Sequence, residues 1–185
     1  MRQINIPDSI LLQVEKPARY IGNEIGAVYK DPEKIPVRVA FCYPDVYEVG
    51  MSHLGLQILY ADFNRMENVY CERVFAPWRD MEAQLRKHAI PLYTLETYTP
   101  VRDMDFLAFT LQYEMSFTNI LNVLDLAGIP LYAKDRTDQD PLIIAGGPTA
   151  SNPEVLAPFI DFFYIGEGEV SYRELFARKS EAKRS

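Results

Sequence analysis

Short apolar runs rich in β-branched and aromatic residues recur along the chain from residue 37 onward. Runs of this length and composition, bounded by turn residues, are typical of buried β-strands. The strong strand candidates are residues 37–43, 106–111, 142–146 and 162–165, and weaker candidates are 71–76 and 92–96. The strong runs are nearly continuous in apolar residues, which favours strands that are covered on both faces.

Helical periodicity fills the intervals between these runs. Apolar residues three or four positions apart define one face of each predicted helix. The predicted faces are Leu56, Leu59, Phe63 and Met66; Trp78, Met81, Leu85 and Ala89; and Phe117, Ile120, Leu121, Leu124 and Ala127. We expect Ser116 to cap the third helix and Gly128 to end it. Shorter helices are expected near residues 10–14, after Asn152-Pro153, and from Ser171 to Lys179.

Strands that alternate with helices predict an α/β fold of the doubly wound type, flavodoxin-like or Rossmann-like. Its mostly parallel sheet would carry helices on both faces, with strands 37–43 and 106–111 adjacent. We expect an N-terminal arm over residues 1–36, which proline and glycine interrupt repeatedly, and one domain over 37–178. Residues 179–185 are expected to form a charged tail that links to a further domain.

Composition narrows the range of functions. The 185 residues carry a formal net charge of −7, so binding to nucleic acid by phosphate neutralisation is not expected of this domain. No apolar stretch reaches the length of a membrane-spanning helix, and the N-terminus does not read as a signal peptide. These features predict a cytoplasmic domain. Its two cysteines, Cys42 and Cys71, are expected to be buried and inert.

The candidate chemistry lies in the loops that follow the predicted strands. In an open parallel sheet, ligands bind beyond the carboxyl ends of the strands, near the point where strand order reverses. The loops concerned are residues 43–55, 112–119, 146–152 and 166–169, all rich in Gly, Ser, Thr, Asn or acids. Neither a dinucleotide-binding G-x-G-x-x-G nor a phosphate-binding G-x-x-x-x-G-K-[ST] occurs in them.

Two longer segments carry a family resemblance. GMSHLGLQILYADF (50–63) and IIAGGPTASNPEVLAPFIDFFYIGEGEVSYREL (143–175) resemble the cobalamin-binding-type N-terminal domain of radical S-adenosylmethionine (SAM) proteins. The resemblance implies a cofactor-binding or substrate-positioning domain that has no turnover alone. It also implies a partner, the C-terminal radical SAM domain of the same full-length protein, which would hold SAM and a [4Fe–4S] cluster. The cluster motif C-x-x-x-C-x-x-C is absent here, because the chain has only two cysteines.

The resemblance also implies positions for a cobalamin cofactor. Gly146 and Gly147 match the place that receives the nucleotide tail, although a tight turn with positive φ explains a glycine pair equally well. Thr110 and Gln112 are expected to present polar groups to the same crevice. Glu167 is expected beside that crevice. Glu167 and Glu114 could act as proton-transfer groups if they are desolvated, or could have a solvated structural role.

His53 needs separate treatment because some cobalamin domains bind cobalt through a histidine. Those domains use D-x-H-x-x-G, whereas this chain has M-S-H-L-G. Without the acid that orients the imidazole, we predict that Ser52, His53 and Gly55 line the crevice or build the helix start. We therefore predict no metal ligand and no catalytic residue in this chain.

Two alternatives remain open. The fold could be retained without cobalamin as a scaffold for contacts with another domain, a protein or RNA. The chain could also be an independent flavodoxin-like or receiver domain, but it lacks the acid cluster and lysine that a receiver needs. The basic and aromatic segment KPARYIGNE (16–24) is expected to act as a docking arm.

Overall fold

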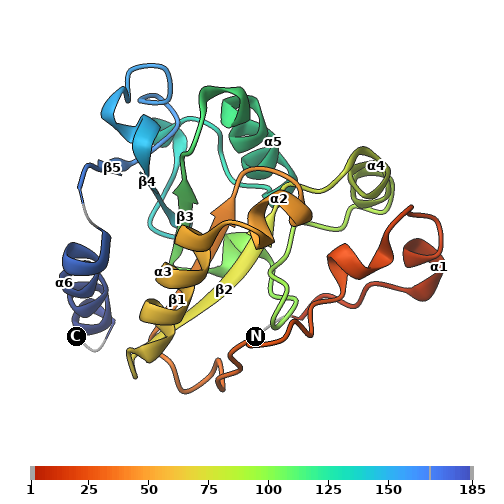
Figure 1. The fold of residues 1–185 in the computed structure, drawn as a ribbon, viewed down its shortest axis with the longest axis horizontal. Coiled ribbons are helices and arrows are strands. Elements are labelled where there is room, and N and C mark those ends of the chain that lie inside the picture. The colour runs from red at the N-terminus through yellow and green to blue at the C-terminus, as the bar shows by residue number, and fades with distance from the viewer. Residues whose placement is uncertain (1–2, 167, 184–185) are drawn as a thin grey trace.

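The computed structural model describes residues 3–166 and 168–183 and contains one five-stranded parallel sheet (Figure 1). The strand order is β2-β1-β3-β4-β5, and every neighbouring pair is parallel. The strands are β1 (Val37–Tyr43), β2 (Val69–Phe75), β3 (Phe106–Thr110), β4 (Leu142–Gly146) and β5 (Phe162–Tyr164). The doubly wound fold and the adjacency of β1 and β3 are confirmed. Of the five strands, β2 had the weakest signal in the sequence.

Six α-helices accompany the sheet in the described part of the chain. They are α1 (Asp8–Leu11), α2 (Tyr47–Met51), α3 (Leu54–Arg65), α4 (Arg79–Lys87), α5 (Phe117–Ala127) and α6 (Gly168–Ala182). Short 3-10 turns are η1 (Pro17–Tyr20), η2 (Val101–Asp103), η3 (Glu114–Ser116), η4 (Ala133–Asp135) and η5 (Pro148–Ser151). None of the helices in residues 3–166 and 168–183 has the length and apolar character needed to cross a membrane.

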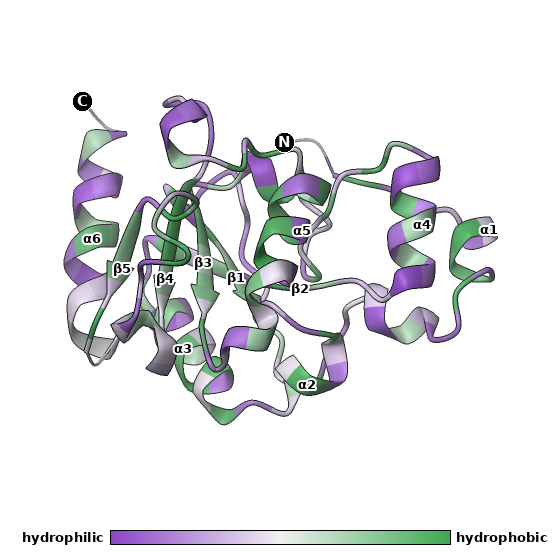
Figure 2. Cartoon of the chain, turned by 90° about the horizontal axis from the view of Figure 1, so that it is seen from above, coloured by the Kyte–Doolittle hydropathy of each residue, from purple (hydrophilic) through white to green (hydrophobic). Residues whose placement is uncertain are grey.

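Each strand sends alternate side chains to two hydrophobic cores, one on each face of the sheet. On one face, Phe41 of β1 packs in a core that includes Phe63 of α3 and Phe176 of α6. On the other face, Cys42 of β1 packs in a core that includes Ile120 of α5. Figure 2 shows the apolar strands running toward the edge at which α2 lies. Because both faces of the sheet are covered, the sequences of the strands are almost unbroken apolar runs.

The N-terminal arm and residues 92–100 cover the outer edge of β2. The Leu95 N–H donates to the Arg73 carbonyl at 2.9 Å, and the Ile4 N–H donates to the Tyr98 carbonyl at 2.8 Å. The strand predicted at 92–96 is wrong, since this segment forms only an isolated bridge between Tyr93 and Pro100. Its alternating side chains pack over an edge strand instead of extending the sheet.

Buried ion pairs flank the covered edge. Arg38 of β1 and Glu72 of β2 lie 3% and 0% exposed and form an ion pair on one face. Arg73 and Glu96 pair at 2.7 Å on the other face, also buried. Three threonines complete the first network, in which Glu72 accepts from Thr94 and Thr97, and Arg38 donates to Thr97 and Thr99.

Several helix predictions need correction. No α-helix follows Asn152-Pro153, because Pro153 and Pro158 cannot donate backbone hydrogen bonds and the intervening residues form turns. Ser116 lies at the start of α5, but its hydroxyl donates to the Tyr113 carbonyl at 2.8 Å and does not cap the helix. Ala89 lies beyond the end of α4, in the left-handed region with φ of 51°.

Helix bounds at the two ends of the chain also differ from prediction. α1 begins and ends earlier than the predicted segment 10–14. α6 begins at Gly168 and continues to Ala182, so part of the segment expected as a charged tail is helical. Lys183 then donates to the Pro36 carbonyl at 2.8 Å, which ties the end of α6 to the beginning of β1. Gly128 ends α5 as predicted, in the left-handed conformation with φ of 69°.

Candidate functional site

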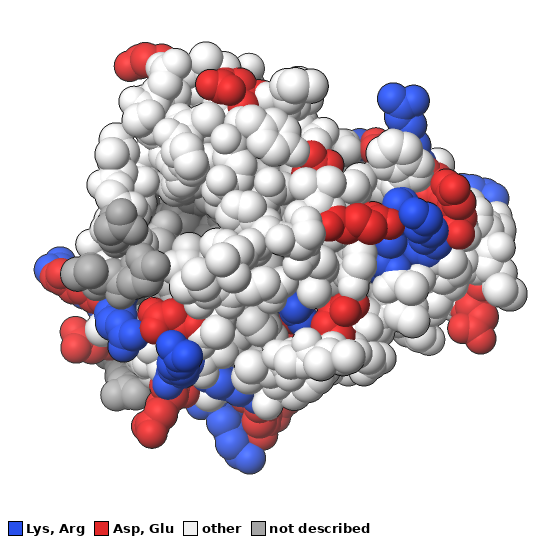
Figure 3. Space-filling model, viewed as in Figure 1, with Lys and Arg blue, Asp and Glu red and all other residues white. Residues whose placement is uncertain are grey.

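The switch point of the sheet lies between β1 and β3. The chain leaves β1 toward β2 on one side and returns to β3 on the other, so the loops that follow β1 and β3 face each other at the carboxyl edge. In the view of Figure 3, the surface in front of β3 and β4 is hollowed and carries few charges. Most Lys, Arg, Asp and Glu side chains visible in this view surround that area.

Two side-chain contacts join these loops across the switch point. The Tyr113 hydroxyl, after β3, donates to the carboxylate of Asp45, after β1. The Asn119 amide, at the start of α5, donates to the Pro44 carbonyl at 2.9 Å. Burial raises the pKa of Tyr113, and its hydrogen bond to the Asp45 carboxylate raises that pKa further. The phenol therefore stays protonated and able to donate at neutral pH.

Asp45 and Tyr113 belong to loops that the sequence indicated, but sequence reasoning singled out neither as a site residue. The available signal was their position, since each follows the end of a switch-point strand within three residues. Their contact depends on the strand order, which brings two segments 68 residues apart to the same place.

His53 begins helix α3 and uses its side chain there. Its Nδ1 accepts the Leu56 N–H at 3.1 Å, which is the hydrogen bond of a helix N-cap. The imidazole also lies against the Tyr43 ring, with centroids 5.1 Å apart. A Cβ on Gly55 would stand 2.9 Å from His53 Cε1, so Gly55 makes room for the ring. Ser52 donates to the Val49 carbonyl at 2.9 Å. His53 and Gly55 thus form the start of α3, and Ser52 ends α2.

Thr110 and Gln112 meet where β3 ends. The Gln112 amide donates to the Thr110 hydroxyl at 2.9 Å, and both residues are largely buried. Glu114 is exposed, and Glu167 lies outside the described residues.

The glycine pair after β4 packs against the chain itself. Gly147 has φ of 110°, and a Cβ there would stand 2.7 Å from the Leu111 carbonyl oxygen. Leu111 is fixed in this place because its N–H donates to the Gly146 carbonyl at 2.7 Å. A Cβ on Gly146 would stand 3.1 Å from the Tyr172 hydroxyl. Packing therefore requires a glycine at position 147, whereas a side chain at position 146 would need only a small shift of the Tyr172 hydroxyl.

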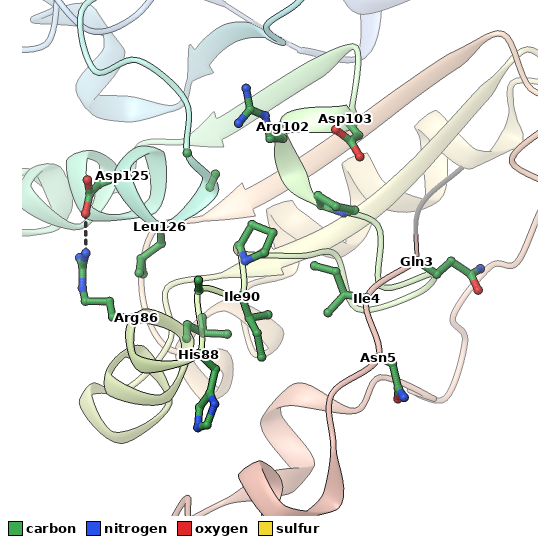
Figure 4. Close-up of a pocket in the computed structure, with 16 residues that line it drawn as sticks. Gln3, Ile4, Asn5, Arg86, His88, Ile90, Arg102, Asp103, Asp125 and Leu126 are labelled. Carbon is green, nitrogen blue, oxygen red and sulfur yellow. Dashed lines mark hydrogen bonds and ion pairs between the residues drawn. The ribbon is translucent and has the colours of Figure 1, made fainter.

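A cavity also opens at the amino edge of the sheet, opposite the switch-point loops. Its volume is about 680 Å³, and it lies between the N-terminal arm, the ends of α4 and α5, and η2 (Figure 4). Arg86 and Asp125 on its rim form an ion pair at 2.7 Å, while Arg102 and Asp103 come from η2. The candidate site residues do not line this cavity.

Comparison with known proteins identifies the family. A family model described as the N-terminal region of radical SAM proteins matches residues 55–185. The chain belongs to this radical SAM N-terminal family. It is also 27% identical over 141 residues to the uncharacterised protein MJ0966 of Methanocaldococcus jannaschii. That match covers 75% of this chain and 26% of the relative, so the chain spans about a quarter of the relative's length.

The positions implied for cobalamin can be tested against these contacts. Gly147 itself is exposed, and only the side on which a Cβ would stand is filled, by the Leu111 carbonyl. His53 Nδ1 is engaged in capping α3, and a protein hydrogen bond crosses the switch point. Gly147 and His53 therefore have structural roles of their own, and these contacts give no support to a cobalamin site.

Proposed function

We propose that this chain is the N-terminal domain of a radical SAM enzyme and positions substrate beside the catalytic domain without using cobalamin. The catalytic chemistry would belong to the part of the enzyme that carries the iron–sulfur cluster and SAM. Cys42 and Cys71 support this division, because they lie on opposite faces of the sheet and are fully buried. Burial raises the pKa of both thiols, which disfavours the thiolate that an iron ligand must supply.

The contact between Tyr113 and Asp45 carries the proposal. It places the chain's own polar groups where a doubly wound sheet binds its ligand. The Asp45 carboxylate accepts hydrogen bonds, and the amide of Gln112, which precedes Tyr113 in the loop after β3, can both donate and accept. Such groups suit the orientation of a polar substrate and leave less room for a large corrin cofactor.

The proposal is tested on the full-length protein, produced in cells supplied with cobalamin. We expect the purified protein to show no cobalamin absorption bands, since His53 Nδ1 is engaged in capping α3 and the hydrogen bond between Tyr113 and Asp45 crosses the switch point. Stoichiometric cobalamin that survives gel filtration would refute the cofactor-free function. Its binding would then be compared in Gly147→Ala, which narrows the tail position, and in Gly26→Ala, where a Cβ meets nothing within 4 Å.

If cobalamin does bind, His53 is still not expected to coordinate cobalt. The imidazole caps α3 through Nδ1, and the sequence lacks the acid that would orient its other nitrogen toward a metal. His53→Ala should then leave the cobalamin spectrum unchanged. Electron paramagnetic resonance of cob(II)alamin on protein labelled with nitrogen-15 histidine would reveal a coordinating nitrogen as superhyperfine coupling.

A further inference from the structure

We propose that the carboxyl edge of the sheet is the docking surface for the catalytic radical SAM domain of the same polypeptide. This inference rests on the proposed function and names the partner that the surface fits. The surface, which we call the apolar edge, consists of Val49, Leu54, Ile58, Met115 and Ile165.

Exposure of large apolar side chains marks this surface. Met115 is 88% exposed, Leu54 71% and Ile165 66%. They follow three different strands, since Leu54 comes after β1, Met115 after β3 and Ile165 after β5. Single exposed apolar residues need no explanation, but their recurrence on three loops of one edge is typical of an interaction site.

The loops concerned lie near one another. Leu54 and Ile58 are one helical turn apart on α3 and therefore share a face of that helix. The loop after β5 reaches the same helix, because a Cβ on Gly168 would stand 3.5 Å from Leu59 Cδ2. The loop after β3 is tied to the loop after β1 by the contact between Tyr113 and Asp45.

Charge points to the kind of partner. Residues 44–57 and 111–119 contain three acids, Asp45, Glu48 and Glu114, and no Lys or Arg. Figure 3 shows a broad uncharged area on this surface, with charges of both signs around it. Interfaces have such an uncharged centre with a polar rim. The complementary face would be apolar at its centre and polar at its margin.

The apolar side chains of this edge suit contact with a folded domain. They are exposed on several loops, whereas the polar groups at the switch point, which the proposed function assigns to substrate, are held by hydrogen bonds within the chain. The family is defined as the N-terminal region of radical SAM proteins, and the curated relative is about four times as long as its matched segment. The occupant we assign is therefore the catalytic domain and not a second copy of this chain.

Hydrogen–deuterium exchange on the full-length protein tests the assignment. We expect amides of residues 52–58 and 111–116 to exchange at least tenfold more slowly in the wild type than in the double variant Leu54→Lys/Met115→Lys. The matched control is Leu12→Lys/Ile25→Lys, which places the same charges on two arm residues that are 82% and 103% exposed. The control should retain wild-type protection. Circular dichroism of each variant verifies that its secondary structure is retained.

Three results would overturn the docking assignment. The first is equal exchange of these loops in the wild type and the edge variant. The second is protection that rises with protein concentration, together with cross-links between copies, which would assign the edge to a second copy. The third is loss of protection in the arm control as well. Absorption spectra of the same samples distinguish failure of the proposed function from failure of the docking assignment. Bound cobalamin would refute the cofactor-free function. Unprotected loops in protein without cobalamin would refute only docking.

Discussion

Replacing Gly147 by alanine distinguishes a glycine required by packing from a glycine reserved for a ligand. Its backbone has φ of 110° and ψ of 179°, a region that residues with a side chain occupy at a cost of about 1–3 kcal/mol. The added Cβ would also stand 2.7 Å from the Leu111 carbonyl oxygen and 3.0 Å from the Leu111 nitrogen. Forcing these atoms apart adds about 1–3 kcal/mol. The smaller entropy of the unfolded alanine chain returns about 0.4–1 kcal/mol.

The expected destabilisation by Gly147→Ala is therefore about 1–5.6 kcal/mol, the sum of the strain and packing costs less the entropy term. Gly26→Ala is the matched control, since Gly26 also has positive φ, of 81°, but a Cβ there meets nothing within 4 Å. The free energy of unfolding of Gly26→Ala should fall only by the cost of backbone strain, about 1–2 kcal/mol. Urea denaturation followed by circular dichroism measures both free energies of unfolding. Equal stability of the two variants would refute the packing explanation and restore a ligand role for Gly147.

Three further predictions follow from buried groups. Cys42 and Cys71 should resist alkylation at pH 8 in the folded protein and react after unfolding in urea, because burial raises the pKa of both thiols; rapid labelling of the native protein would contradict this. Glu72→Ala should cost about 3–5 kcal/mol because it removes the carboxylate that forms the buried ion pair with Arg38. Glu174→Ala, which breaks an exposed pair with Arg178, should cost at most about 1 kcal/mol, and equal losses in urea unfolding would argue against the buried network. Finally, the free energy of unfolding should fall as pH rises above 10. Burial raises the pKa of Tyr60, Tyr70 and Tyr93, so these tyrosines keep their protons in the folded state while those of the unfolded chain ionise at their ordinary pKa. A free energy of unfolding that stays constant between pH 9 and 11 would contradict this prediction.

Much of the fold could be predicted because both faces of the sheet are covered. Full coverage makes β1, β3 and β4 continuous apolar runs, and a single helix period marks α3 and α5. β2 was harder to recognise because Glu72 and Arg73 interrupt its apolar pattern. Their charges are compatible with burial only through Arg38 and Glu96, and the sequence alone does not reveal those partners.

The candidate site could be predicted less completely than the fold. Its location followed from topology, since loops after parallel strands meet at one edge. Individual roles did not follow, because they depend on contacts between distant segments. Gly147 lies against the Leu111 carbonyl, and Asp45 accepts a hydrogen bond from Tyr113. Neither contact leaves a pattern in the sequence. His53 is the exception, since its place directly before an apolar helical face favoured a role at the helix start, where it lies.

Metal analysis of the full-length protein, performed beside this chain alone, tests the central claim most directly. Both samples are reconstituted anaerobically with iron and sulfide in the presence of cobalamin, desalted, and analysed for iron and cobalt. A cofactor-free positioning domain predicts about four iron atoms per full-length chain, and neither iron nor cobalt in residues 1–185 alone. It also predicts no cobalt in the full-length protein. Stoichiometric cobalt in either sample, or a cluster in this chain alone, would contradict the account.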